Sequence, residues 1–133
     1  MLQFTKEVDY SIQLLESLNN LKGDQLLSLR KFSKETGISF LFLQRIAKKL
    51  REAGLVESTK GSCGGYRLSK SLKGVDLKTV VEIIEGEYAV ANCLKEGCTC
   101  SRKGKCISEK VFKVVNKKLV KILESIKLGE IFK

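Results

Sequence analysis

Two short helical segments joined by a glycine turn constrain the fold of this 133-residue chain more than any other feature. The first segment begins at Ser28, a helix-capping residue, and ends at Gly37. Ser39 is placed to cap the second segment, which Gly54 closes. The inward-facing residues of the second segment follow the i, i+3, i+4, i+7 spacing of an amphipathic helix and are Leu43, Ile46, Ala47 and Leu50. Two helices at this spacing are typical of a helix-turn-helix, whose second helix enters the major groove of DNA.

A glycine-rich hairpin is expected directly after the second helix. Residues 55–59 and 66–69 have the composition of two short strands, and the six residues between them include three glycines. Lys60 at the tip can reach phosphates or the narrow minor groove, and the glycines let the backbone approach a duplex closely. Helix pairs and hairpins also occur singly in many proteins, but their order here predicts a winged helix-turn-helix.

The positive charge of the chain is concentrated on the same window. The formal net charge is +10, and residues 39–70 carry seven basic residues against two acidic ones. Such an excess attracts polyanions, so nucleic acid is the expected partner. A lysine-rich surface can also serve solubility alone. The coincidence of the charge with the predicted helix and wing favours double-stranded DNA.

Two further helices are expected to support this DNA-binding unit. Thr5 caps a helix that extends to about Asn20, and residues 25–27 form a short extended piece after it. Asp76 caps another helix, which ends at Glu85-Gly86. The apolar spacing of both helices predicts that they pack inward through Val8, Ile12, Leu15 and Leu18 in the first and Leu77, Val80, Val81 and Ile84 in the other.

A long amphipathic helix is predicted at the C-terminal end. It begins at Ser108, with Glu109 in its first turn, and extends to Gly129. Its apolar stripe consists of Val111, Val115, Leu119, Ile122 and Ile126. A lone helix of this kind is expected to bury its stripe against a second copy of the chain, and a two-fold dimer would place two recognition helices on a pseudo-palindromic operator. The alternative is that the helix folds back onto the first helix of the same chain.

Four cysteines lie on one polar, glycine-bearing loop in a chain without histidine, at Cys93, Cys98, Cys100 and Cys106. Clustered thiolates bind soft metals such as zinc or the iron of an iron-sulfur cluster. A total of five cysteines argues against a fully paired disulfide framework. The loop is therefore expected to be a thiolate metal site or a metal-free redox switch. Four thiolates could also form a closed zinc site without a sensing role.

The sequence as a whole predicts a mainly α fold with a small β wing and a long C-terminal dimerisation helix. The expected units are the winged helix-turn-helix over residues 1–86, the cysteine-rich loop over 87–107 and the dimerisation helix over 108–133. Without a signal peptide or a run of about 18 apolar residues, the protein is expected in the cytoplasm and not in a membrane. Without histidine, paired carboxylates or a phosphate-binding loop, it is not expected to be an enzyme or to act on a small-molecule substrate.

These motifs together resemble the bacterial winged-helix regulators that include the iron-sulfur regulator IscR and the nitric-oxide-responsive repressor NsrR. The resemblance covers nearly the whole chain and is carried by Gly37-Ile38-Ser39, the wing run Gly64-Gly65-Tyr66-Arg67-Leu68, the helix end Glu85-Gly86 and the cysteines. It implies a homodimeric transcription regulator whose affinity for its operator depends on an iron-sulfur cluster, 2Fe-2S or 4Fe-4S. The implied signal is nitric oxide, redox stress or iron-sulfur status.

The expected DNA contacts fall into two groups. The helix pattern and the resemblance place Ser39, Phe42, Gln44, Arg45 and Lys48 on the recognition helix, and Lys60, Tyr66 and Arg67 on the wing. Lys60 keeps the charge of the arginine common at this wing position in relatives, but not its planar fork. Phe42 has the alternative of a core residue, and Cys63 is interpreted as a tolerated small side chain.

The resemblance also implies the cluster ligands. Relatives commonly use three cysteines with five residues between successive ones, a spacing that Cys100 and Cys106 show here. One of Cys98 and Cys100 would then be spare. The spacing slightly favours Cys93 with Cys100 and Cys106, and the alternative is that all four thiolates complete the site.

A further ligand is implied on the first helix. Asp9 aligns with the aspartate that NsrR-like relatives donate from the partner subunit to a 4Fe-4S cluster. Glu109 stands where other relatives place a histidine ligand to a 2Fe-2S cluster, and Glu7 and Glu109 are weaker substitutes for Asp9. The alternative role for Asp9 is a first-turn acid that complements the helix dipole.

Overall fold

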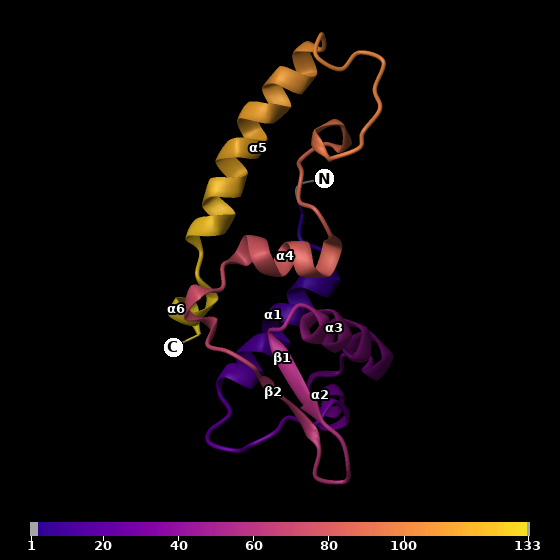
Figure 1. The fold of residues 1–133 in the computed structure, drawn as a ribbon. Coiled ribbons are helices and arrows are strands. Elements are labelled where there is room, and N and C mark those ends of the chain that lie inside the picture. The colour runs from indigo at the N-terminus through magenta and orange to yellow at the C-terminus, as the bar shows by residue number, and fades with distance from the viewer. Residues whose placement is uncertain (1–2, 133) are drawn as a thin grey trace.

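The computed structural model describes residues 3–132, which form a mainly helical fold with one small sheet (Figure 1). The helices are α1 (Lys6–Asn19), α2 (Leu29–Thr36), α3 (Phe40–Glu52), α4 (Leu77–Glu85), α5 (Ile107–Ser125) and α6 (Leu128–Ile131), with short 3-10 turns η1 (Leu72–Gly74) and η2 (Asn92–Leu94). The strands β1 (Val56–Thr59) and β2 (Gly65–Leu68) pair antiparallel, with Val56 opposite Leu68. The prediction of a mainly α fold with a small β wing is confirmed.

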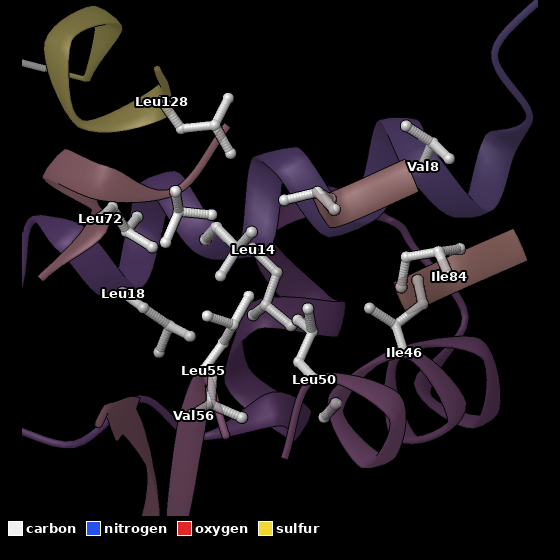
Figure 2. Close-up of a cluster of buried hydrophobic side chains, with 14 of the residues drawn as sticks. Val8, Leu14, Leu18, Ile46, Leu50, Leu55, Val56, Leu72, Ile84 and Leu128 are labelled. Carbon is white, nitrogen blue, oxygen red and sulfur yellow. The ribbon is translucent and has the colours of Figure 1, made fainter. Parts of the chain in front are cut away.

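One hydrophobic core holds the helices and the base of the wing together. The apolar stripes of α1, α3 and α4 converge, so that Leu15, Ile46 and Val80 are each 0% exposed. Figure 2 shows side chains from these helices and from β1 pointing toward one another, with Leu128 at the margin of the cluster. Truncating one such leucine to alanine typically costs about 2–5 kcal/mol of stability. The core is therefore rigid enough to position the outward faces of α3 and the wing.

The helix-turn-helix forms as the capping pattern predicts, with one exception. The Ser28 side chain accepts a hydrogen bond from the Lys31 N–H, and Gly37 ends α2 in the left-handed conformation at φ 80°. Ser39 occupies the N-cap position of α3, but its side chain makes no capping hydrogen bond. The prediction of a Ser39 side-chain cap is wrong: only its backbone carbonyl serves the helix, accepting from the Leu43 N–H at 3.0 Å. Ser39 is an exposed residue.

The wing is attached to the core by a third extended segment. Leu27 and Tyr66 exchange both backbone hydrogen bonds, at 2.8 and 2.9 Å, which confirms the short extended piece after α1. This contact requires glycine at position 65, because an added Cβ would lie 2.7 Å from the Leu27 carbonyl oxygen. The wing therefore projects from a fixed base.

The C-terminal helix differs from its prediction at both ends. It begins at Ile107 and stops at Ser125, whereas the apolar stripe suggested one helix from Ser108 to Gly129. The helix ends where its backbone bonds to residues at the start of α4: the Leu77 N–H donates to the Ile126 carbonyl at 2.9 Å, and the Leu128 N–H donates to the Val75 carbonyl at 3.0 Å. The short α6 then packs on η1 and buries Leu128.

The packing partner of α5 is α4 together with η2, and the cysteine-bearing loop connects α4 to the start of α5 (Figure 1). The predicted alternative, a fold back onto α1, is not the main contact, since α1 packs chiefly on α3 and α4. None of the helices within residues 3–132 is long and apolar enough to cross a membrane.

Candidate nucleic-acid interface and cysteine loop

Helix α3 has two opposite faces with the same periodicity. The inward face is completely buried, at 0% exposure, and consists of Leu43, Ile46, Ala47 and Leu50. The outward face is exposed at the spacing i, i+3, i+4, i+7 and consists of Leu41, Gln44, Arg45 and Lys48. Because burial of one face fixes the rotation of the helix, the outward side chains are presented together on one side.

Phe42 lies between these two faces. Its ring packs edge-on against Tyr10 of α1, with the ring centroids 5.4 Å apart. The Arg45 guanidinium lies over the Phe42 ring, 5.0 Å from its centroid. Phe42 is thus partly a core residue, the alternative that the sequence left open, and it also supports the side chain of Arg45.

The two neighbouring lysines of α3 have different surroundings. Lys48 has a side chain 67% exposed and makes only a 4.0 Å contact with Glu52. The Lys49 ammonium instead donates to Glu7 at 3.1 Å and to the Ile84 carbonyl at 2.8 Å. Lys49 therefore links α3 to α1 and α4. Its ion pair also engages the carboxylate of Glu7, which is one of the weaker candidates for a cluster ligand.

The wing presents its predicted residues unequally. Lys60 is exposed at the tip, whereas the Arg67 guanidinium bonds across the sheet to Glu57 at 2.5 Å. Tyr66 is half-buried, packs on the core and is fixed by its backbone pairing with Leu27. Of these three wing residues, Lys60 has the side chain most available to a polyanion.

The cysteine loop does not gather its four thiols into one group. Cys93, Cys98 and Cys106 are half-buried, Cys100 is exposed, and all are free thiols. Within residues 3–132, no three cysteine or carboxylate side chains lie together as they would around a metal ion. The loop itself is anchored by Glu87, whose carboxylate accepts from the Glu96 N–H at 3.0 and 3.1 Å. Its thiols are of the type that suits a soft metal, but they are not gathered around a common point.

The start of α5 creates a local environment for Cys106. The nearby backbone N–H groups of Glu109 and Ser108, followed by the Ser108 hydroxyl and the charge of Arg102, lower the pKa of Cys106. Burial opposes this change only in part. Cys106 therefore has more thiolate character than an ordinary cysteine.

Glu109 closes the cysteine loop against the same helix. Its carboxylate, in a residue only 5% exposed, accepts from the Gly104 N–H at 3.0 Å and pairs with Lys113 at 3.0 Å. The Gly104 N–H and then the Lys113 charge lower the pKa of Glu109. Sequence reasoning missed this anchoring role. The available signal was an acid in the first turn of α5 with a lysine four residues later.

Asp9 and Cys63 lie away from the four thiols in sequence and in their local contacts. Asp9 accepts a hydrogen bond from the Gln13 side chain at 2.9 Å and lies 3.9 Å from the Lys6 ammonium. These contacts match its alternative role as a first-turn acid of α1, and its side chain is still 46% exposed. Cys63 is exposed in the wing turn.

Several large apolar side chains are exposed on α5. Of the nine exposed large hydrophobic residues identified within residues 3–132, six lie on this helix: Ile107, Val111, Phe112, Val114, Val115 and Ile122. Exposed apolar side chains gathered on one helix make it a candidate interaction site.

Comparison with known proteins matches this chain to one family and to several of its sequences. The sequence model of the Rrf2 family, described as an iron-dependent transcriptional regulator, matches residues 4–133. The HTH-type transcriptional regulator IscR of Vibrio campbellii is 30% identical over 105 residues, which are 79% of this chain and 62% of that protein. Protein rrf2 of Nitratidesulfovibrio vulgaris is 24% identical over 132 residues, covering 99% of this chain and 88% of that protein. The chain thus spans about three-fifths of the length of the IscR relative.

Solved structures share the fold over nearly the whole chain. CymR, the global cysteine regulator of B. subtilis, superposes with a TM-score of 0.75 at 21% identity, covering 99% of this chain and 97% of that one. IscR of T. potens superposes with a TM-score of 0.71 at 24% identity, covering 98% and 85%. At these identities the likeness shows a common fold.

Proposed function

Because this chain belongs to the Rrf2 family of transcriptional regulators, we propose that it binds double-stranded DNA as a homodimer and that the cysteine loop controls its operator affinity. The observation that carries DNA binding is the outward face of α3, exposed beside the wing while the opposite face is completely buried. A helix held in this way can enter the major groove without disturbing the core.

The proposed contacts divide into base readers and phosphate binders. Gln44 and Arg45 lie in the first half of α3, where helix-turn-helix proteins contact base edges, and their amide and guanidinium groups suit adenine and guanine. Lys48 on α3 and Lys60 on the wing supply flexible point charges for phosphates. Ser39, Tyr66 and Arg67 have smaller proposed roles, since Arg67 is already paired with Glu57.

The proposed homodimer forms through the exposed apolar face of α5. Two copies of this face, related by a two-fold axis, would cover side chains that otherwise remain in water. The same symmetry would present two α3 helices to the half-sites of a pseudo-palindromic operator.

The proposed control element is an iron-sulfur cluster held by the cysteine loop. Cys93 and Cys106, with Cys98 or Cys100 or both, are the candidate ligands, and Asp9 of the partner subunit is a candidate for a remaining position. The thiolate character of Cys106 supports this role, because the thiolate is the form that binds metal. When bound, such a cluster supplies a centre that reacts with nitric oxide or oxidants and that depends on iron supply. The protein's part is to bring the separated thiols together, which would reorder the loop between α4 and α5.

A metal-free thiol switch is the second candidate. It needs two thiols and not three grouped ligands, and no such group of three lies within residues 3–132; the lowered pKa of Cys106 also supports it. In this case a peroxide would accept two electrons and two protons from two thiols, forming a disulfide and reordering the same loop. A structural zinc-thiolate site is a third arrangement with the same ligands and no sensing.

The DNA contacts are tested with alanine variants of the proposed contact residues, and Lys48 is compared with its neighbour Lys49. Operators are first selected from genomic DNA with the wild-type chain, and affinity is measured by fluorescence anisotropy at several salt concentrations. Arg45→Ala is expected to lose about 1–3 kcal/mol of binding. Lys48→Ala and Lys60→Ala are each expected to reduce the salt dependence by about one unit per subunit.

Lys49→Ala serves as the control for this experiment. It is expected to lower the free energy of unfolding by about 1 kcal/mol, because it releases the contacts to Glu7 and Ile84. Its operator affinity should stay close to wild type. Unchanged binding in both Arg45→Ala and Lys60→Ala would contradict the assignment of this face.

The control element is tested on protein purified without oxygen. Absorption and Mössbauer spectra are recorded, and iron, sulfide and zinc are assayed in the same sample. Iron with sulfide supports the cluster and separates 2Fe-2S from 4Fe-4S. Zinc alone, retained after attempted iron loading, supports the structural site. Metal-free protein that gains a disulfide with peroxide supports the thiol switch.

A further inference from the structure

Leu41 is the most exposed large hydrophobic residue identified within residues 3–132, with 73% of its surface accessible. Six of the other exposed apolar residues lie on α5, where the proposed dimer contact would cover them. Leu41 instead lies in the first turn of α3, on the helix-turn-helix. The dimer therefore offers no explanation for its exposure.

Leu41 shares its surface with the proposed base readers. It begins the outward series that continues with Gln44, Arg45 and Lys48, so all four side chains project from one side of α3. Together with Ser39 and Phe42 they line an open hollow of about 530 Å³. An apolar side chain thus stands among polar groups of the kind that contact base edges.

The chemistry of the major groove restricts what Leu41 can contact favourably. Leucine has no hydrogen-bond donor or acceptor, so it would leave the polar edge of a base without a partner. Among the four bases, thymine alone presents a methyl group in the major groove. We propose that Leu41 reads the methyl group of a thymine in each operator half-site, next to a guanine contacted by Arg45. This inference rests on the proposed function, in which α3 enters the major groove.

The position of the guanine follows from the support of Arg45. Its guanidinium lies over Phe42, which packs against Tyr10, so the side chain is held in place before DNA arrives. A supported guanidinium suits the two acceptors of guanine. One helical turn, about 6 Å, separates Leu41 from Arg45, so the thymine should lie within about two base pairs of the guanine.

The test removes one methyl group at a time from the DNA. In the selected operator, each thymine is replaced by deoxyuridine, which lacks only the 5-methyl group, symmetrically in both half-sites. Wild-type affinity is expected to fall about fourfold per half-site at one thymine near a guanine. Leu41→Ala should bind both DNAs equally, because the contact has been lost from the protein side.

Two further variants separate the contact from an indirect effect. Leu41→Met keeps an apolar side chain and is expected to retain most of the sensitivity to deoxyuridine. Ile131→Ala removes another exposed apolar side chain, 64% accessible and outside α3, and should retain all of it. Circular dichroism checks that each variant is folded.

The outcomes distinguish this inference from the proposed function. Operator binding that tolerates every deoxyuridine substitution would overturn the reading role of Leu41 and leave DNA binding by α3 intact. The same conclusion follows if Leu41→Ala keeps the wild-type sensitivity. Failure of the wild-type chain to select any DNA would overturn the proposed function itself, and the inference with it.

Discussion

At the scale of single residues, the start of α5 organises an irregular loop. The first N–H groups of a helix have no partner within the helix, and they carry partial positive charge. Here the N–H groups of Ser108 and Glu109 lower the pKa of the nearby Cys106, while the Glu109 side chain holds the loop at Gly104. One helix end therefore adjusts both the charge of a thiol and the path of the chain that carries the others.

The reactivity of Cys106 should reflect this environment. Because its pKa is lowered, Cys106 in metal-free protein should remain open to alkylation by iodoacetamide at a pH below that of an ordinary thiol. The double change Arg102→Gln and Ser108→Ala removes a charge and a hydroxyl donor, so the midpoint of alkylation should move to higher pH. Mass spectrometry of the labelled peptide measures this midpoint.

Lys103→Gln is the control for that measurement. It removes one positive charge from the same loop, but Lys103 is not among the groups that lower the pKa of Cys106. An identical midpoint in the double variant and the wild type would show that Arg102 and the Ser108 hydroxyl do not act on this thiol.

At the scale of elements, α6 ties the end of α5 to the base of the wing. It packs on η1, which follows β2 closely, and Lys127 lies 3.6 Å from Asp76. Gly129 permits this close approach, because a Cβ there would lie 2.7 Å from the Lys73 backbone nitrogen. The end of α5 is therefore connected, through α6 and η1, to the segment between the wing and α4.

Gly129→Ala should loosen this attachment. The added methyl group meets backbone atoms on η1, which cannot rotate away, so the expected cost is about 1–3 kcal/mol in the free energy of unfolding. Urea denaturation measures the cost, and hydrogen exchange should quicken over residues 126–132. Gly74→Ala is the matched control, because nothing lies within 4 Å of its added Cβ. Equal stability of the two variants would contradict a tight contact at Gly129.

At the scale of the whole molecule, charged and apolar surfaces are separated. Apart from Leu41, the outward face of α3 and the wing tip are polar and basic, whereas six of the nine exposed large hydrophobic residues within residues 3–132 lie on α5. In Figure 1, α5 and the wing extend in opposite directions from the core. This separation suits a molecule that associates through one end and contacts a polyanion with the other.

Dimerisation should therefore depend on the apolar face of α5. Changing Val111 and Ile122 together to glutamine should shift the protein toward monomer and weaken operator binding, because each half-site would then be bound alone. Sedimentation velocity measures the association. Changing Lys110 and Lys121 to glutamine alters the same helix while sparing its apolar face, and the dimer should persist. A monomeric wild-type chain at micromolar concentration would contradict the proposal.

Much of the fold could be predicted because its signals are local. Ser28 and Gly37 mark the ends of α2 within a few residues of the structure they determine, and the caps Thr5 and Asp76 do the same for α1 and α4. The wing hairpin follows from the glycines at its turn. In each case the physical cause lies in the sequence segment itself.

The C-terminal end was harder to predict, because its structure depends on a distant segment. The helix pattern continued past Ile126, but bonds to residues 75–77 end α5 there. These bonds have no signature in the sequence around Ile126. The contact of Glu109 with Gly104 is local by contrast, since it spans five positions, but the spacing of Glu109 and Lys113 indicated only an ion pair.

The sequence by itself determined the winged helix-turn-helix, the outward series on α3 and the thiol-rich loop, since periodicity and capping act over one or two helical turns. Only the tertiary structure decided which charges are free. Lys48 and Lys49 are adjacent residues of the same type. Lys48 is exposed, whereas Lys49 bonds to Glu7 and Ile84, which lie 42 and 35 positions away in the chain. Adjacent residues on a helix point about 100° apart. Packing of α3 against α1 and α4 therefore selects which lysine can reach a partner.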